Sequence, residues 1–177
     1  IIFDYLYSHK YEVFRGSSED VLDRFYQCAK KFSIDTIVRI TADNPLIDPE
    51  IVNNAIKQYC DSNCDYLTNS IDRTFPNGTE VEIFSFKSLE QAWKNAILPS
   101  EREHVTPYFY NNSNLFKIHD EIQSSDISNL RWTVDTENDL FLVKSIVLDV
   151  LCFEQYFICF FLIEYSSLQY LHHLIMK

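Results

Sequence analysis

Apolar residues recur at helical spacing in one stretch of the chain and at strand spacing in the next. Ser17 and Ser18 can cap a helix, because their hydroxyls can accept hydrogen bonds from the free N–H groups of a first turn. The apolar residues that follow keep to one helical face: Val21, Leu22, Phe25, Ala29 and Phe32. A β-branched run over 36–41 then predicts a strand.

The next helix has a strong start signal. Asp48 supplies a capping carboxylate, Pro49 suits the first turn, and Glu50 lies near the positive end of the helix dipole. Four apolar residues form its expected buried stripe: Ile51, Ala55, Ile56 and Tyr59.

Further elements continue the alternation towards the C-terminus. Strands are predicted over 65–69, 79–84, 116–122 and 130–134, with a Phe-Pro-Asn-Gly turn over 75–78. Helices are predicted over 1–11, 89–96 and 99–110, and Thr136 with Asp139 forms a variant capping box for another. This order predicts an α/β architecture with helices on both faces of a sheet. We expect one domain over 1–150 and a separate aromatic tail over 151–177.

The tail is rich in Leu, Phe, Ile and Tyr, and 155–163 carries no charge. That stretch is too short to span a bilayer, so we expect no membrane span. A core or interface helix is the first interpretation, a tail altered by truncation or frameshift the second, and a membrane-surface role the third. The chain begins with Ile1 and shows no signal peptide, which indicates a processed N-terminus or a piece of a longer product.

The formal net charge of −11 argues against nucleic acid as a partner, because phosphate contacts require clustered Lys and Arg. An acidic protein that binds a nucleotide needs a metal ion or a few well-placed cations. Five cysteines without a disulfide-framework spacing indicate reduced thiols and a cytoplasmic location.

Two aspartates are the leading candidates for chemistry. Asp43 and Asp135 each follow a predicted strand and precede a predicted helix, and ligands of open α/β sheets bind at that edge. Two such carboxylates could hold Mg²⁺, which completes its shell with water and substrate phosphates. The alternative is structural: Asp43 orders its turn and Asp135 helps to cap the last helix.

Five ordered motifs resemble the spore-coat-polysaccharide and acylneuraminate cytidylyltransferases. They are VFRGS (13–17) with DVLDR (20–24), VRITADNPLID (38–48), FPNGTEVE (75–82), SEREHVTPY (100–108), and RWTVDT (131–136) with DL (139–140). The resemblance implies a Rossmann-like nucleotidyltransferase fold, a three-layer sandwich. The first strand and the phosphate loop of that fold have no counterpart in the sequence, and 1–11 matches the helix that would precede the VFRGS motif.

The resemblance also implies an activity and a set of site residues. Such enzymes condense CTP with a sugar, often an acidic one, and release pyrophosphate, in surface polysaccharide or glycan biosynthesis. Asp43 and Asp135 would be the Mg²⁺ ligands. The residues near the base and ribose would be Arg15, Gly16, Ser17, Asp20 and Arg24. Those on the sugar side would be Arg39, Gly78, Glu80, Glu82, Glu101, Arg102 and His104. A homodimer is the expected assembly.

Each of these roles has a structural alternative. Gly16 can permit a tight turn, Arg24 can pair with Asp20 on a helix surface, and Glu80 and Glu82 can lie on one solvated strand face. The charged run 101–103 can be an ordinary helix start, and His104 can be a packed imidazole.

Two classes of function follow. The first is a cytidylyltransferase. The second is a catalytically inactive fragment or interaction subunit of that family, which buries its aromatic tail against a partner. A glycosyltransferase is a weaker third, because Ala42-Asp43-Asn44 does not supply an Asp-x-Asp metal motif.

Overall fold

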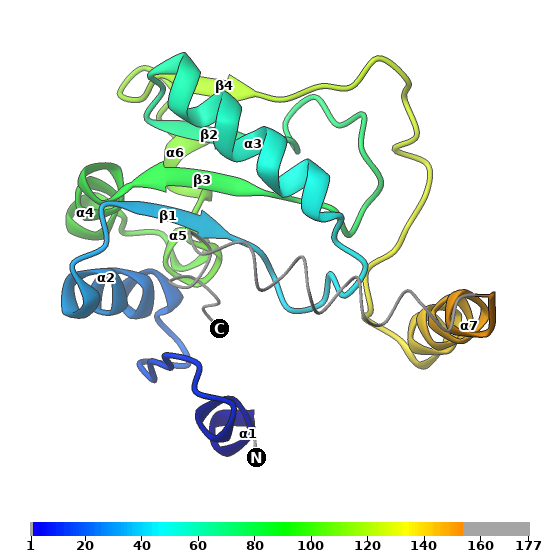
Figure 1. Ribbon diagram of the computed structural model, residues 1–177. Coiled ribbons are helices and arrows are strands. Elements are labelled where there is room, and N and C mark those ends of the chain that lie inside the picture. The colour runs from blue at the N-terminus through cyan, green and yellow to red at the C-terminus, as the bar shows by residue number, and fades with distance from the viewer. Residues whose placement is uncertain (1, 154–177) are drawn as a thin grey trace.

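A mixed four-stranded sheet forms the centre of the molecule, in a computed structural model that describes residues 2–153. Its strands are β1 (Thr36–Arg39), β2 (Tyr66–Thr68), β3 (Glu82–Ser85) and β4 (Ile118–Asp120). Their order is β1-β3-β2-β4 (Figure 1). β3 runs antiparallel to both of its neighbours, whereas β2 and β4 are parallel. The predicted α/β fold class is confirmed.

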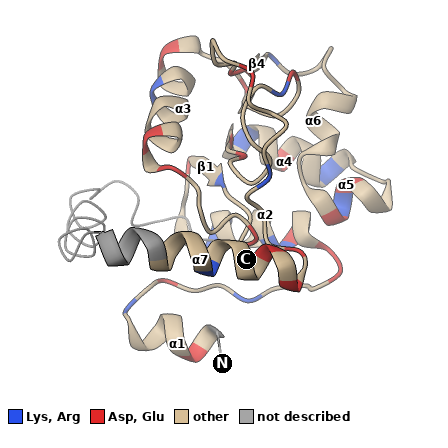
Figure 2. Ribbon diagram, turned by 90° about the vertical axis from the view of Figure 1, so that its right-hand side faces the viewer, with Lys and Arg blue, Asp and Glu red and all other residues tan. Residues whose placement is uncertain are grey.

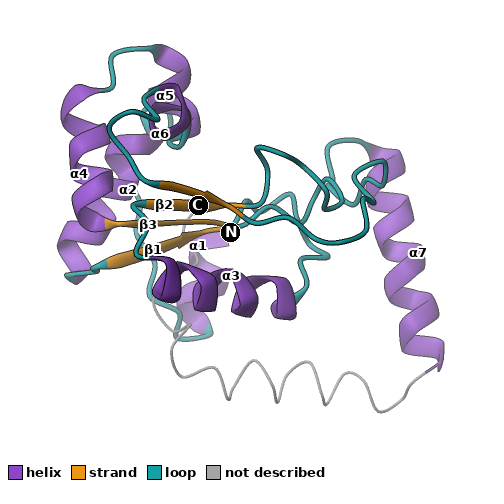
Figure 3. Cartoon of the chain, turned by 90° about the horizontal axis from the view of Figure 1, so that it is seen from above, coloured by secondary structure: helices purple, strands orange, loops and turns teal. Residues whose placement is uncertain are grey.

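Helices cover both faces of this sheet, as Figure 3 shows. The helices of the described chain are α1 (Ile2–Ser8), α2 (Val21–Phe32), α3 (Pro49–Ser62), α4 (Phe86–Asn95), α5 (Pro99–His104), α6 (Pro107–Asn111) and α7 (Glu137–Phe153), of which α2 to α6 cover the sheet. α3 packs on one face and α2, α4, α5 and α6 on the other, whereas α7 lies beyond the strand ends. Within the described part of the chain, no helix is both long enough and apolar enough to cross a membrane.

Strand alternation divides the apolar residues between two cores. Tyr66 and Phe84 point to the face of α2 and α6, where they stack around Phe109 at ring-centroid distances of 4.9 and 5.1 Å. Leu67 and Ile83 point to the opposite face and pack on α3. Since successive residues of a strand face opposite ways, a short sheet can bury both of its faces.

The predicted helix starts are confirmed for α3 and corrected for α2. Asp48 caps α3, accepting a hydrogen bond from the backbone N–H of Glu50 at 2.8 Å. The cap of α2 is Asp20, which accepts from Asp23 N–H at 2.9 Å, and not Ser17 or Ser18. Ser17 instead accepts from Asp20 N–H and orders the turn before the helix.

The single helix predicted over 99–110 is two helices. Val105 has a φ of 72°, a left-handed value that a β-branched residue adopts only under strain, and it separates α5 from α6. Pro107 then begins α6. Because proline has no N–H and clashes with the preceding turn, a continuous helix through Pro107 is disfavoured.

The predicted strand over 130–134 is also wrong. This segment is extended but forms only one isolated bridge, between Arg131 and Asn77. The predicted strand over 79–84 begins later, at Glu82, because Val81 N–H is bonded to the side chain of Asn69 at 2.9 Å. The aromatic tail from 154 onward lies outside the described residues.

One carboxyl group in the body of the fold carries an unpaired oxygen. Glu121 is 7% exposed, and its Oε1 accepts from Gln58 at 2.7 Å, while its Oε2 is buried without a partner. Burial is the main cause that raises the pKa of this carboxyl above its usual range. Desolvation disfavours the charged form, so the folded protein holds this proton more tightly than the unfolded chain does.

We therefore expect Glu121→Gln to gain stability relative to the parent protein as the pH rises. A raised folded-state pKa contributes stability below the unfolded pKa, and this contribution is lost as the pH rises through the folded value. Urea unfolding of both proteins between about pH 4 and about pH 7 measures the difference. A difference that does not change with pH would contradict the prediction.

Candidate active site

A pocket of about 270 Å³ opens beside the ends of the central strands. Its lining comes from three segments that are far apart in the sequence, and every lining residue is polar or charged. The lining residues are Arg39, Thr41, Asp43, Asn44, Ser70, Arg73, Asn77, Glu80, Glu82, Thr133 and Asp135.

Backbone hydrogen bonds hold these segments together. Asn77 donates its N–H to Leu130 O at 2.9 Å, and Trp132 donates to Asn77 O at 2.6 Å. Val134 donates to Asp43 O at 2.8 Å, which brings the extended segment against the loop after β1. These three bonds place Asp135 at the pocket that Asp43 lines.

Gly78 makes the close approach possible. Its φ is 102°, and a Cβ built on it would lie 2.5 Å from the backbone nitrogen of Thr133 and 2.7 Å from the carbonyl carbon of Trp132. Both obstacles are backbone atoms, which cannot move aside as the end of a long side chain can. The predicted site residue Gly78 therefore acts in this structure as a point of contact between two chain segments.

We expect Gly78→Ala to lower the free energy of unfolding by about 2 kcal/mol, because it adds both a clash and an unfavourable backbone conformation. Gly16→Ala is the matched control. There the new Cβ would meet mainly the flexible side chain of Arg24, at 2.9 Å from its Cγ. Urea unfolding of the two variants should show the larger loss for Gly78→Ala, and equal losses would contradict this assignment.

The two candidate metal ligands lie in this one pocket but have different partners. Asp43 accepts a long hydrogen bond from Thr133 Oγ1 at 3.4 Å. Asp135 is paired with Arg131 at 2.5 Å on the more exposed side. Arg131 also contacts Asp139, which accepts from the N–H groups of Asp135 and Thr136. Asp139 in turn donates its N–H to Thr136 Oγ1 at 3.3 Å, which completes the predicted capping box.

The small number of carboxylates that Asp43 and Asp135 supply fits a magnesium ion. Across residues 2–153, no three or more His, Cys, Asp or Glu side chains are grouped to hold a metal. A cation here would thus be bound by at most the two carboxylates and would depend on water and phosphate oxygens for the rest. Magnesium is commonly bound in that way.

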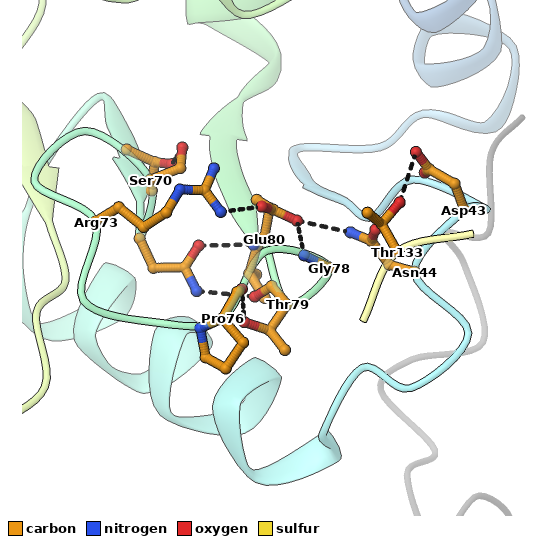
Figure 4. Close-up of polar contacts among 12 residues, drawn as sticks. Asp43, Asn44, Ser70, Arg73, Pro76, Gly78, Thr79, Glu80 and Thr133 are labelled. Atoms are coloured by element: carbon orange, nitrogen blue, oxygen red, sulfur yellow. Dashed lines mark hydrogen bonds and ion pairs between the residues drawn. The ribbon is translucent and has the colours of Figure 1, made fainter. Parts of the chain in front are cut away.

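Glu80 lies at the centre of the polar network in the pocket (Figure 4). Its Oε2 accepts from Asn44 Nδ2 and from Gly78 N–H, both at 3.0 Å, and its Oε1 pairs with Arg73. In Figure 4, Arg73 reaches this carboxylate from one side and Asn44 from the other. Three donors hold the carboxylate in place, so the expectation of a solvated strand face is wrong for Glu80.

Glu82 forms a second and more deeply buried pair. It is 6% exposed, forms an ion pair with Arg39 across the β1–β3 ladder, and accepts from the Tyr66 hydroxyl at 2.6 Å. Burial, and then the charge of Glu82, raise the pKa of Tyr66 well above its usual range. Tyr66 therefore stays protonated and serves as a hydrogen-bond donor to this carboxylate.

Glu82→Gln should lower the free energy of unfolding by roughly 3 kcal/mol, because it leaves the partly buried Arg39 guanidinium without its counter-charge. Glu90→Gln is the control, since Glu90 pairs with Lys94 on an exposed face of α4. The control substitution should leave the free energy of unfolding nearly unchanged. Chemical unfolding measures both, and the prediction is wrong if the two variants behave alike.

The five residues predicted for the nucleotide gather at the start of α2 but do not line this pocket. Arg24 donates to Ser17 O at 2.8 Å, and Gly16 lies against Arg24. Arg15 is exposed, with its guanidinium 5.7 Å from the ring centroid of Phe3. The surface pair expected between Arg24 and Asp20 is replaced by the pair of Asp20 with Arg102.

The motif over 100–108 also lies outside the pocket. Arg102 joins α5 to α2 through two contacts to Asp20 and one to Trp93 O. Glu101 is 4% exposed and accepts from Asn111 Nδ2 at 3.3 Å, whereas His104 is exposed at the end of α5. Glu101 and Arg102 therefore serve in this structure to connect helices.

Several residues of the pocket lining were not predicted as site residues, and Arg73 is the most consequential of them. It lies two residues before the Phe-Pro-Asn-Gly turn, and an arginine beside such a motif in an acidic chain is the signal that could have found it. Asn44 and Thr133 lie within the quoted motifs but had no assigned role.

A mixed sheet covered by helices on both faces, with a charged pocket at its strand ends, is an α/β protein whose candidate site lies where open α/β sheets bind ligands. Comparisons with known proteins agree. The sequence model of the family described as cytidylyltransferase matches residues 5–167. A solved cytidylyltransferase from Leptospira borgpetersenii is 37% identical, with a TM-score of 0.76, over 81% of this chain and 61% of that one.

Two curated proteins are also similar. An uncharacterized protein of Methanocaldococcus jannaschii, MJ1063, is 44% identical over 129 residues, covering 72% of this chain and 52% of that protein. The spore coat polysaccharide biosynthesis protein SpsF of Bacillus subtilis is 30% identical over 141 residues, covering 77% of this chain and 57% of that protein. The chain belongs to the cytidylyltransferase family, and it spans about half the length of these curated relatives.

Proposed function

We propose that this chain provides the sugar and metal side of a nucleotidyltransferase site that joins CTP to a sugar, giving a CMP-sugar and pyrophosphate. One observation carries the proposal: Asp43 and Asp135, 92 positions apart in the sequence, line the same pocket as the polar pairs of β1 and β3. The family membership and the likeness to a spore coat polysaccharide biosynthesis protein support it.

In the proposed reaction, a sugar hydroxyl oxygen attacks the α-phosphorus of CTP. The bond from that phosphorus to the bridging oxygen breaks, pyrophosphate leaves with the electron pair, and the hydroxyl proton passes to a base or to water. Mg²⁺ held by Asp43 and Asp135 would offset the charge of the phosphates. Without a cation, the lining would repel them, since its two arginines face four carboxylates: Asp43, Glu80, Glu82 and Asp135.

The residues of the chain would have distinct tasks in this scheme. Thr133 would orient Asp43, and the backbone bond from Val134 to Asp43 O would keep both metal-binding segments in place. Arg131 would be released from Asp135 when a cation binds, and Asp139 would retain it as a second partner. Glu80 and Glu82 would receive sugar hydroxyls.

An interaction role is the second candidate function, and one observation favours it. α7 exposes five large apolar side chains between positions 140 and 148: Leu140, Phe141, Leu142, Val147 and Leu148. Figure 2 shows the charges of α7 concentrated towards its start. Such a surface suits a partner or a second copy of the chain, as in the expected homodimer.

A thermal-shift panel with CTP, UTP, GTP and ATP, each with and without Mg²⁺, tests the proposed function. We expect a Mg²⁺-dependent rise with CTP alone, and a ligand at a hundred times its Kd stabilises the fold by about 2.7 kcal/mol. Asp43→Asn should abolish the rise. Asp61→Asn, at an exposed position near the end of α3, makes the same change outside the pocket and should retain it.

The absence of any nucleotide response in the parent protein would reject the enzymatic proposal and leave the interaction role. A response of equal size in both aspartate variants would reject the metal assignment.

A further inference from the structure

Arg131 lies between two carboxylates that differ in their surroundings. Its Nη2 atom is 2.5 Å from Asp135 Oδ2 and 3.3 Å from Asp139 Oδ2, so one nitrogen contacts both. The Asp135 side chain is 54% exposed and lines the pocket, whereas the Asp139 side chain is 19% exposed. A small movement of one guanidinium can therefore transfer its charge from Asp135 to Asp139.

The carboxylate of Asp139 is fixed by the backbone around it. Its Oδ2 accepts from the N–H groups of Asp135 at 3.0 Å and Thr136 at 2.8 Å, and Thr136 Oγ1 accepts from Asp139 N–H at 3.3 Å. These bonds tie Asp139 to the start of α7, and they would have to break before it could turn away. Asp139 thus offers Arg131 a partner that stays in place when Asp135 binds something else.

Asp135 is the carboxylate that the guanidinium and a divalent cation would have to share. Only its Oδ2 contacts Arg131, but the negative charge of a carboxylate is spread over both oxygens. A cation on the other oxygen would also lie close to the guanidinium, and like charges so close together repel each other. Asp43 has no such competitor, since within residues 2–153 its carboxylate accepts a hydrogen bond only from Thr133 Oγ1.

We infer that Arg131 is the counter-ion of Asp135 in the cation-free protein, and that a divalent cation displaces it onto Asp139. This inference rests on the proposed function, because it concerns the cation of that site. Before a cation binds, the arginine offsets the negative charge that Asp135 brings to the pocket beside Asp43. It also makes cation binding weaker than the two carboxylates alone would give. A phosphate-bearing ligand, which adds its own oxygens to the shell of the cation, would make up the difference.

Titration with Mn²⁺ alone tests this competition, with electron paramagnetic resonance to measure the free ion. Mn²⁺ prefers the same oxygen ligands as Mg²⁺. We expect Arg131→Gln to bind Mn²⁺ about threefold more tightly than the parent protein, because an exposed ion pair is weak and its loss shifts an equilibrium only a few fold. Equal affinities of the two proteins would overturn the inference.

Lys144→Gln is the matched control for this titration. It removes one positive charge at an exposed position of α7, away from the two aspartates that Arg131 contacts. In about 0.15 M salt, exposed charges more than about 8 Å apart are largely screened, so the affinity of this variant for Mn²⁺ should stay that of the parent protein. A gain as large as that of Arg131→Gln would show a general charge effect and would overturn the inference.

A double-mutant cycle tests the part played by Asp139. Asp139→Asn removes the second partner of Arg131, so Arg131 should remain on Asp135 and Mn²⁺ should bind about threefold more weakly than to the parent protein. In the Arg131→Gln background the same substitution should change the affinity little, because there is no guanidinium left to hold. An equal loss in both backgrounds would show that Asp139 acts through its own charge, and would overturn the displacement onto it.

The thermal-shift response to CTP and Mg²⁺ in the same variants keeps the two proposals apart. A CTP response together with an unchanged Mn²⁺ affinity in Arg131→Gln rejects the counter-ion role alone. Tighter Mn²⁺ binding by Arg131→Gln without any CTP response rejects the proposed reaction, while the counter-ion role stands. No binding of Mn²⁺ by either protein and no response to CTP reject both.

Discussion

The close approach of the Gly78 loop to the backbone of Trp132 and Thr133 is the contact on which the site depends. Three chain segments meet there, and the bonds that join them run from backbone to backbone. Backbone bonds of this kind fix positions more tightly than a pair of long side chains, because fewer torsions must be ordered. The contact places Asp43 and Asp135 at one pocket without any strand pairing between their segments.

The second constraint is the management of charge. The chain carries a formal net charge of −11, yet the two glutamates of the pocket each pair with an arginine inside it. Carboxylates removed from water are tolerated only when they are paired or hydrogen-bonded, and both conditions are met for the buried Glu82 and the partly buried Glu80. The pairs therefore let the pocket hold these carboxylates without leaving their charges uncompensated.

Polar contacts also connect the helices that pack around Tyr66, Phe84 and Phe109. Asp20 caps α2 and also receives Arg102 from α5, so one carboxylate orders a helix start and connects two helices. Trp93 of α4 donates its indole N–H to Asp23 at 2.8 Å and stacks on Tyr26. Motif residues that a family resemblance assigns to ligands thus also support the scaffold around them.

The sequence by itself determined the class of the fold, the start of α3 at Asp48 and the expectation that Asp43 and Asp135 lie at one edge of the sheet. These features depend on local signals, namely apolar periodicity, capping chemistry and residues that follow strands. Only the tertiary structure decided that 130–134 is no strand, that Arg73 belongs to the site, and that Glu80 and Glu82 are paired. Those facts depend on which segments, distant in the sequence, contact one another in the fold, and a local sequence pattern does not specify such contacts.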